Sequence, residues 1–92
     1  MTTDPHIGER MARGARVREL SQSAMFQEAV KEVDGFYREA LFKTTLEASA
    51  KREELFMEYH ALKRVLVRLN SWQQDGEVAQ AEMARDRVED EQ

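Results

Sequence analysis

The stretch that decides the fold is residues 48–74, which read ASAKREELFMEYHALKRVLVRLNSWQQ. Seven residues recur in it at alternating spacings of four and three, the pattern of one face of a helix. They are Ala48, Arg52, Leu55, Tyr59, Leu62, Leu66 and Leu69, and Phe56, Val65 and Trp72 broaden that face. At a rise of about 1.5 Å per residue the stretch predicts a helix of roughly 40 Å. Asp75-Gly76 is expected to end it, because glycine readily takes the left-handed conformation that stops a helix.

The residues upstream predict a partner helix over 24–43. Its main stripe is Phe26, Val30, Val33, Tyr37 and Ala40, and Met25, Ala29, Phe36 and Leu41 widen it. Ser21 or Ser23 is expected to cap its first turn. Thr44 with Glu47 three residues later fits a capping box that starts the next helix. A connection this short brings the two helices back alongside each other, so an antiparallel helical hairpin is predicted.

The two ends of the chain predict shorter elements. Residues 1–20 form a basic N-terminal arm with a short helix over 9–20, residues 21–76 form the hairpin core, and residues 77–92 form an acidic C-terminal helix or tail. Gly14 weakens the first helix by about 1 kcal/mol relative to alanine. Gly35 either lets another backbone come close or is simply tolerated. The predicted fold class is therefore all-α, a hairpin with a long third helix between two shorter flanking elements.

The charge is unevenly distributed along the chain. The net charge of the 92 residues is −4. Residues 75–92 hold seven acids against two bases, whereas Arg10, Arg13, Arg16 and Arg18 crowd into the first 20 residues. Arginine binds phosphate through two parallel hydrogen bonds. These four residues are the candidate contact with DNA or with an acidic protein partner, the alternative being a solvated helix face.

Catalysis is not expected from this sequence. It has no cysteine and two histidines, His6 and His60. The positions three and four residues from His60 are Phe56, Met57, Lys63 and Arg64, which offer no second metal ligand. Glu53, Glu54 and Glu58 fit the solvated face of a helix. No cofactor, metal or small-molecule substrate is predicted, and no apolar run approaches the roughly 18 residues of a membrane span.

The hydrophobic face of residues 48–74 is longer than one helix of 24–43 can cover. We therefore expect a second chain to complete it, either another copy or a larger protein. The candidate interface residues are Phe56, Leu62, Leu66, Leu69 and Trp72. Trp72 serves equally well in an interface, where tryptophan is enriched, and in the core of the monomer.

Several short motifs lie between residues 20 and 76. They are Phe26-Gln27-Glu28-Ala29, a helix centred on Tyr37, Arg52-Glu53-Glu54-Leu55, Ala61-Leu62, Leu69 and Asp75-Gly76. In these motifs the chain resembles short, acidic, all-helical proteins encoded in the head and DNA-packaging gene clusters of tailed bacteriophages and prophages. That group often carries a tryptophan before its central threonine, where this chain has Phe42. The resemblance implies a virion-assembly or DNA-packaging context, in the virion or the host cytoplasm, and no catalytic residue.

Three functions follow as hypotheses. The first is a non-enzymatic phage structural or assembly protein that makes helix–helix contacts with itself or with a larger head or portal protein. The second is a DNA-packaging subunit similar to a small terminase, which binds DNA through the arginine-rich arm. The acidic total charge counts against the second. The third is a regulatory adaptor that mimics DNA with its acidic tail.

Overall fold

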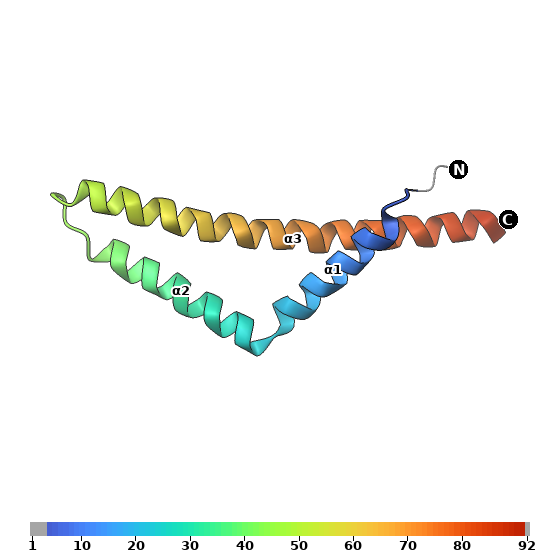
Figure 1. The fold of residues 1–92 in the computed structure, drawn as a ribbon, viewed down its shortest axis with the longest axis horizontal. Coiled ribbons are helices and arrows are strands. Elements are labelled where there is room, and N and C mark those ends of the chain that lie inside the picture. The colour runs from blue at the N-terminus through green and yellow to red at the C-terminus, as the bar shows by residue number, and fades with distance from the viewer. Residues whose placement is uncertain (1–3, 92) are drawn as a thin grey trace. The chain divides into compact units, whose positions relative to one another are not determined.

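The computed structural model describes the backbone of residues 4–91 and the side chains of residues 4–89, and in this part of the chain it is all-helical. Helix α1 spans Ile7–Gln22, α2 spans Ala24–Phe42 and α3 spans Ser49–Glu91 (Figure 1). The chain divides into two compact units. We call residues 22–67 the hairpin unit, and residues up to 21 together with those from 68 onward the arm unit.

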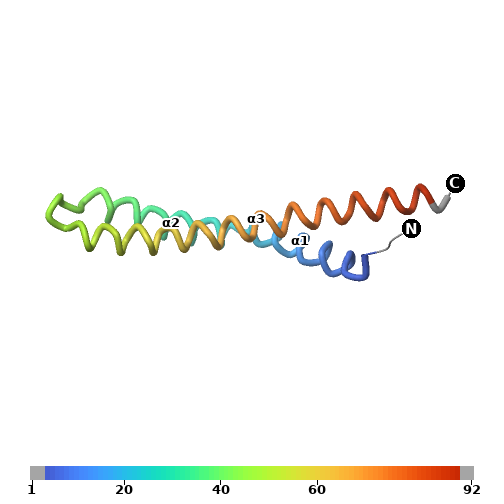
Figure 2. The backbone as a smooth tube through the Cα atoms, turned by 90° about the horizontal axis from the view of Figure 1, so that it is seen from above, coloured from blue at the N-terminus to red at the C-terminus, as the bar shows by residue number. Residues whose placement is uncertain are grey.

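In the hairpin unit, α2 and the first half of α3 run antiparallel (Figures 1 and 2). Ser23 is the N-cap of α2, and its hydroxyl accepts a hydrogen bond from the backbone N–H of Phe26 at 3.3 Å. The predicted serine cap is therefore confirmed. Leu55 is buried, while Tyr59, Leu62 and Leu66 are half-buried, so the main stripe of α3 is the face turned toward α2.

The predicted capping box at Thr44 and Glu47 is wrong. Helix α3 begins only at Ser49. The Thr44 hydroxyl instead donates to the backbone carbonyl of Leu41 at 2.7 Å and accepts from Nε of Arg52 at 3.1 Å. Thr44 thus satisfies a carbonyl at the end of α2 and ties the loop to α3, so it is not free to cap the next helix.

In the arm unit, α1 crosses the second half of α3. Val17 and Ala79 are buried there, and Gly14 and Gly76 meet backbone to backbone. A Cβ atom built on Gly14 would lie 2.7 Å from Cα of Gly76. Real Cβ atoms do not come so close, so only glycine at both positions permits this crossing.

The predicted end of the third helix at Asp75-Gly76 is therefore wrong. Helix α3 continues unbroken to Glu91, and no described glycine has a positive φ. Residues 77–91 are rich in Glu, Ala and Arg, which are good helix formers. The separate helix predicted from residue 77 is thus the second half of α3. The small residue at position 76 serves the close approach of α1, the role that the sequence left open for Gly35, which has nothing within 4 Å.

Candidate functional site

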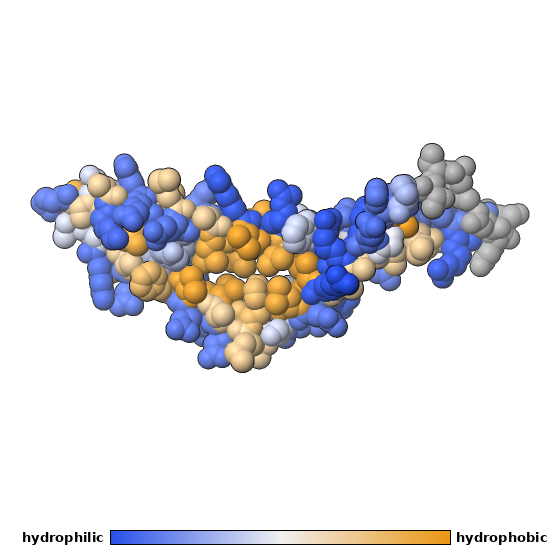
Figure 3. Space-filling view, in the orientation of Figure 1, coloured by the Kyte–Doolittle hydropathy of each residue, from blue (hydrophilic) through white to orange (hydrophobic). Residues whose placement is uncertain are grey.

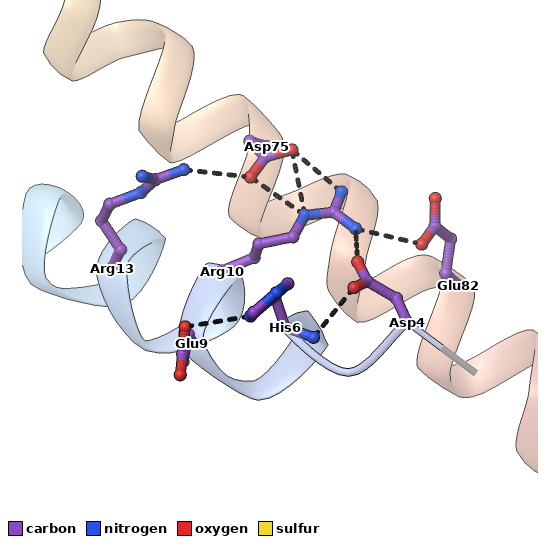
Figure 4. Close-up of polar contacts among 7 residues, drawn as sticks. All are labelled: Asp4, His6, Glu9, Arg10, Arg13, Asp75 and Glu82. Carbon is purple, nitrogen blue, oxygen red and sulfur yellow. Dashed lines mark hydrogen bonds and ion pairs between the residues drawn. The ribbon is translucent and has the colours of Figure 1, made fainter.

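The predicted arginine cluster lies on α1. Two of its members, Arg10 and Arg13, form ion pairs with α3, whereas the other two, Arg16 and Arg18, are exposed. Arg10 faces three carboxylates of the arm unit (Figure 4). Its Nη2 lies 2.9 Å from Oδ1 of Asp75, and its Nε donates to both oxygens of the same carboxylate. Its Nη1 lies 2.7 Å from Asp4 and 3.4 Å from Glu82.

These contacts shift the pKa values of the groups involved. The hydrogen bond from Arg10 holds the pKa of Asp75 below its ordinary value. The pKa of Asp4 is also lowered, first by the backbone N–H of His6 and then by Arg10. The pKa of Arg10 itself is raised by Asp75 and then Asp4. Arg10 is therefore a structural cation that pins α1 to α3.

The other three arginines differ from Arg10. Arg13 lies 3.4 Å from Asp75, and its guanidinium carbon sits 4.9 Å from the centre of the Trp72 ring. Arg16 and Arg18 are exposed and make no ion pair with the side chains of residues 4–89. The structure does not bring the four arginines together as one unpaired cationic surface.

One side of the hairpin unit is polar. The Tyr59 hydroxyl donates to Oδ1 of Asp34 at 2.6 Å and accepts from Nε of Arg38 at 3.2 Å. Arg38 and Lys63 also pair with Asp34, at 2.8 and 3.3 Å. The hydrogen bond from Tyr59 is the main reason why the pKa of Asp34 is lowered. This cluster fixes the register of α2 on α3.

The opposite side of the hairpin unit is apolar and exposed. On α2, Ala29 and Phe36 lie at four-three spacing from Val33 of the main stripe, so the three residues form a second strip along one edge of that stripe. Phe36 is 62% exposed and Val33 41%. In the face drawn in Figure 3, hydrophobic residues gather over the middle of α3, whereas hydrophilic residues cover most of the face near the loop between α2 and α3.

Helix α3 continues this apolar side. Tyr37 lies near Glu58, which contributes after burial to the raised pKa of the Tyr37 hydroxyl. Glu58 lies five residues before Lys63, about 140° around α3, so it is on the side of the hairpin away from Asp34, with which Lys63 pairs. Ala61 and Val65 follow Glu58 at three and seven residues, on the same strip, and Val65 is 58% exposed. We call Ala29, Val33, Phe36, Ala61 and Val65 the apolar side of the hairpin.

The interface residues named from the sequence are dispersed. Leu62 and Leu66 lie on the face toward α2, whereas Leu69 and Trp72 belong to the arm unit. Phe56 is 59% exposed and stacks on His60, with the ring centres 6.1 Å apart. It lines a shallow depression with Arg52, Glu53 and Met57. Nine residues separate it from Val65, which on a helix is about half a turn, so the two face opposite directions.

Sequence reasoning placed Phe36 and Val65 among residues that broaden the core stripes and missed their exposure. The signal that could have found them is the second strip, offset by about one residue from the main stripe on each helix. Two such strips on the same side of antiparallel helices indicate an apolar surface that the contact between these two helices does not cover.

Comparison with known protein families, curated proteins and solved structures finds no match to this chain. Within the described residues, no helix is long and apolar enough to span a membrane. The side chains described over residues 4–89 also form no group of three or more potential metal ligands.

Proposed function

We propose that this protein is a non-enzymatic assembly protein that acts through helix–helix contacts made by the apolar side of its hairpin. The observation that carries the proposal is the exposure of Val33, Phe36 and Val65 on one side of that unit. Its opposite side is closed by the Asp34–Tyr59 cluster. Contiguous exposed apolar surface on a small protein marks an interaction site more often than it marks chance.

The context proposed for this activity is phage assembly, with a head or portal protein or the chain itself as partner. That context rests on the sequence resemblance alone. The helix–helix contact rests on the apolar side and would stand without a phage partner.

The test compares two phenylalanines of the same helix. Phe36 lies on the apolar side, whereas Phe42 is 90% exposed at the end of α2, on another flank. Alanine favours helix at both positions, so neither change weakens α2. We expect Phe36→Ala to weaken association at least thirtyfold, the loss typical of truncating an aromatic anchor, and Phe42→Ala to leave it unchanged.

The readout is molar mass by light scattering coupled to size exclusion, for the chain alone and with candidate head and portal proteins. Circular dichroism confirms that both variants remain helical. A parent chain that stays monomeric and binds none of these proteins, or variants that behave alike, would refute the proposed function.

The DNA-packaging alternative has one observation in its favour, the exposure of Arg16 and Arg18. Arg10 and Arg13 are engaged with Asp75, which reduces the charge that the arm offers to phosphate. DNA binding through this arm must weaken steeply with salt. A labelled duplex that shows no binding at about 50 mM salt, or equal binding after Arg16→Ala with Arg18→Ala, would exclude it. The acidic-adaptor alternative is weakened because part of the acidic charge of α3 holds Arg10.

A further inference from the structure

The charged residues on the apolar side of the hairpin include two acids that no cation neutralises. Glu58 lies on the α3 strip itself, three residues before Ala61. Glu32 borders the α2 strip, because it lies three residues after Ala29 and four before Phe36. Both glutamates are exposed, and neither forms an ion pair with a described side chain.

The two lysines on this side are already paired. Lys43 pairs with Glu39 of its own helix at 2.8 Å. Lys51 lies 3.8 Å from Glu54, also on its own helix. Each lysine is about two turns from a residue of the strip on its helix, so both belong to the apolar side. After these pairs are formed, the side keeps a net negative charge from the two unpaired glutamates.

A partner that covers the apolar side also covers one of these carboxylates. Glu58 lies near Tyr37 of α2, where it contributes, after burial, to the raised pKa of the Tyr37 hydroxyl. Glu58 is therefore turned toward α2, and an occupant seated on both strips removes its carboxylate from water. Burying a carboxylate without a cation is costly, so a wholly apolar partner surface is disfavoured.

We infer that the occupant of the apolar side is a basic amphipathic helix of another protein. This inference rests on the proposed function and names the chemistry of the partner. The apolar stripe of that helix packs on Val33, Phe36 and Val65. A lysine or arginine on one edge of the stripe pairs with Glu32 of α2, and another on the opposite edge pairs with Glu58 of α3.

A second copy of this chain lacks the charges that this side requires. If two copies joined by their apolar sides, each would bring Glu32 and Glu58, so acids of both copies would meet in one interface. Lys43 and Lys51 could neutralise them only by leaving the partners that they have on their own helices. Like charges brought together in an interface oppose association.

The opposite side of the hairpin has the other sign of charge. Arg38 and Lys63 both pair with Asp34, at 2.8 and 3.3 Å, which leaves an excess of positive charge in that cluster. Lys31 adds to this excess, because it is exposed and lies three residues before Asp34. A basic helix is repelled there, so the distribution of charge directs it to the apolar side.

The test compares two synthetic helical peptides as probes. Both carry the same leucine stripe at four-three spacing, and the positions that flank the stripe are all lysine in one peptide and all glutamate in the other. The readout is the dissociation constant of each labelled peptide with the full chain, by fluorescence anisotropy. We expect the lysine peptide to bind at least tenfold tighter at low salt, and the difference to shrink as salt is added. Phe36→Ala should weaken binding of the lysine peptide at least tenfold.

Two double variants separate the apolar side from the net charge of the chain. Glu32→Lys with Glu58→Lys should reverse the preference, so that the glutamate peptide binds tighter. Glu47→Lys with Glu53→Lys is the matched control, because it changes the net charge equally. Glu47 lies in the loop between α2 and α3, and Glu53 lines the depression beside Phe56. We expect the control to keep the preference for the lysine peptide, and circular dichroism confirms that both variants remain helical.

Three outcomes would overturn the inference. The first is a parent chain that binds both peptides equally or prefers the glutamate peptide. The second is an equal change of preference in the two double variants, which would show that net charge decides. The third is a parent that binds neither peptide; a homodimer weakened by Phe36→Ala would then identify a second copy as the occupant. In each case the proposed function stands if Phe36→Ala still weakens association with the chain itself or with a head or portal protein, so the two failures can be told apart.

Discussion

The glycine contact of the arm unit gives the sharpest test of the structure. Gly14→Ala would place a methyl group 2.7 Å from Cα of Gly76 and 3.2 Å from the carbonyl oxygen of Trp72. Both neighbours are backbone atoms, so neither can rotate away. The helices must separate at the crossing, and the buried contacts of Val17 and Ala79 loosen with them.

Two opposing terms set the magnitude. Alanine is favoured over glycine inside a helix by about 1 kcal/mol. Forcing an extra carbon into a tight contact costs about 1–3 kcal/mol. We therefore expect Gly14→Ala to lower the free energy of unfolding by up to about 2 kcal/mol. Gly35→Ala is the matched control, since its Cβ meets nothing within 4 Å. It should gain about 1 kcal/mol.

The assay is urea unfolding of both variants, followed by circular dichroism, with hydrogen exchange of the α1 amides as a local probe. The two glycines are both interior helix positions, so propensity alone predicts the same gain for both. Opposite signs support the close crossing. An equal stabilisation by Gly14→Ala and Gly35→Ala, with unchanged exchange in α1, would contradict it.

Three further outcomes follow from named contacts. Ser23→Ala removes the side-chain acceptor that caps α2 and should cost about 1 kcal/mol, measured by urea unfolding. Leu55→Ala should cost about 2–5 kcal/mol because Leu55 is 6% exposed, whereas Val67→Ala, at a 64% exposed position, should be nearly neutral. The lowered pKa of Asp75 means that its carboxylate stabilises the fold above the ordinary aspartate pKa and loses that effect as pH falls through the folded-state value. The protection of the α1 amides from hydrogen exchange, relative to the unfolded chain at the same pH, should thus fall in acid, and Arg10→Gln should reduce that dependence on Asp75. An unchanged acid sensitivity in this variant would argue against the assignment.

The sequence by itself determined the all-helical class, a serine cap at Ser21 or Ser23, and the inward stripe of Leu55, Tyr59, Leu62 and Leu66. These are local properties, since side-chain spacing sets which face of a helix is apolar and a cap acts on its own first turn. The same local logic failed at Asp75-Gly76. A glycine can end a helix, but it can also let a second helix pass close to the first. The residues around position 76 do not indicate that Gly14 packs against them.

Only the tertiary structure decided which charged residues are paired and which apolar residues are exposed. Arg10 and Arg13 resemble a cationic surface until Asp75, more than 60 residues away in the chain, is placed against them. Phe36 and Val65 resemble core residues until the register of α2 on α3 leaves them on an exposed side. Whether a charge is neutralised and whether an apolar side chain is exposed depend on which residues distant in sequence become neighbours. Packing between helices decides this, and the hydrophobic period within a single helix does not.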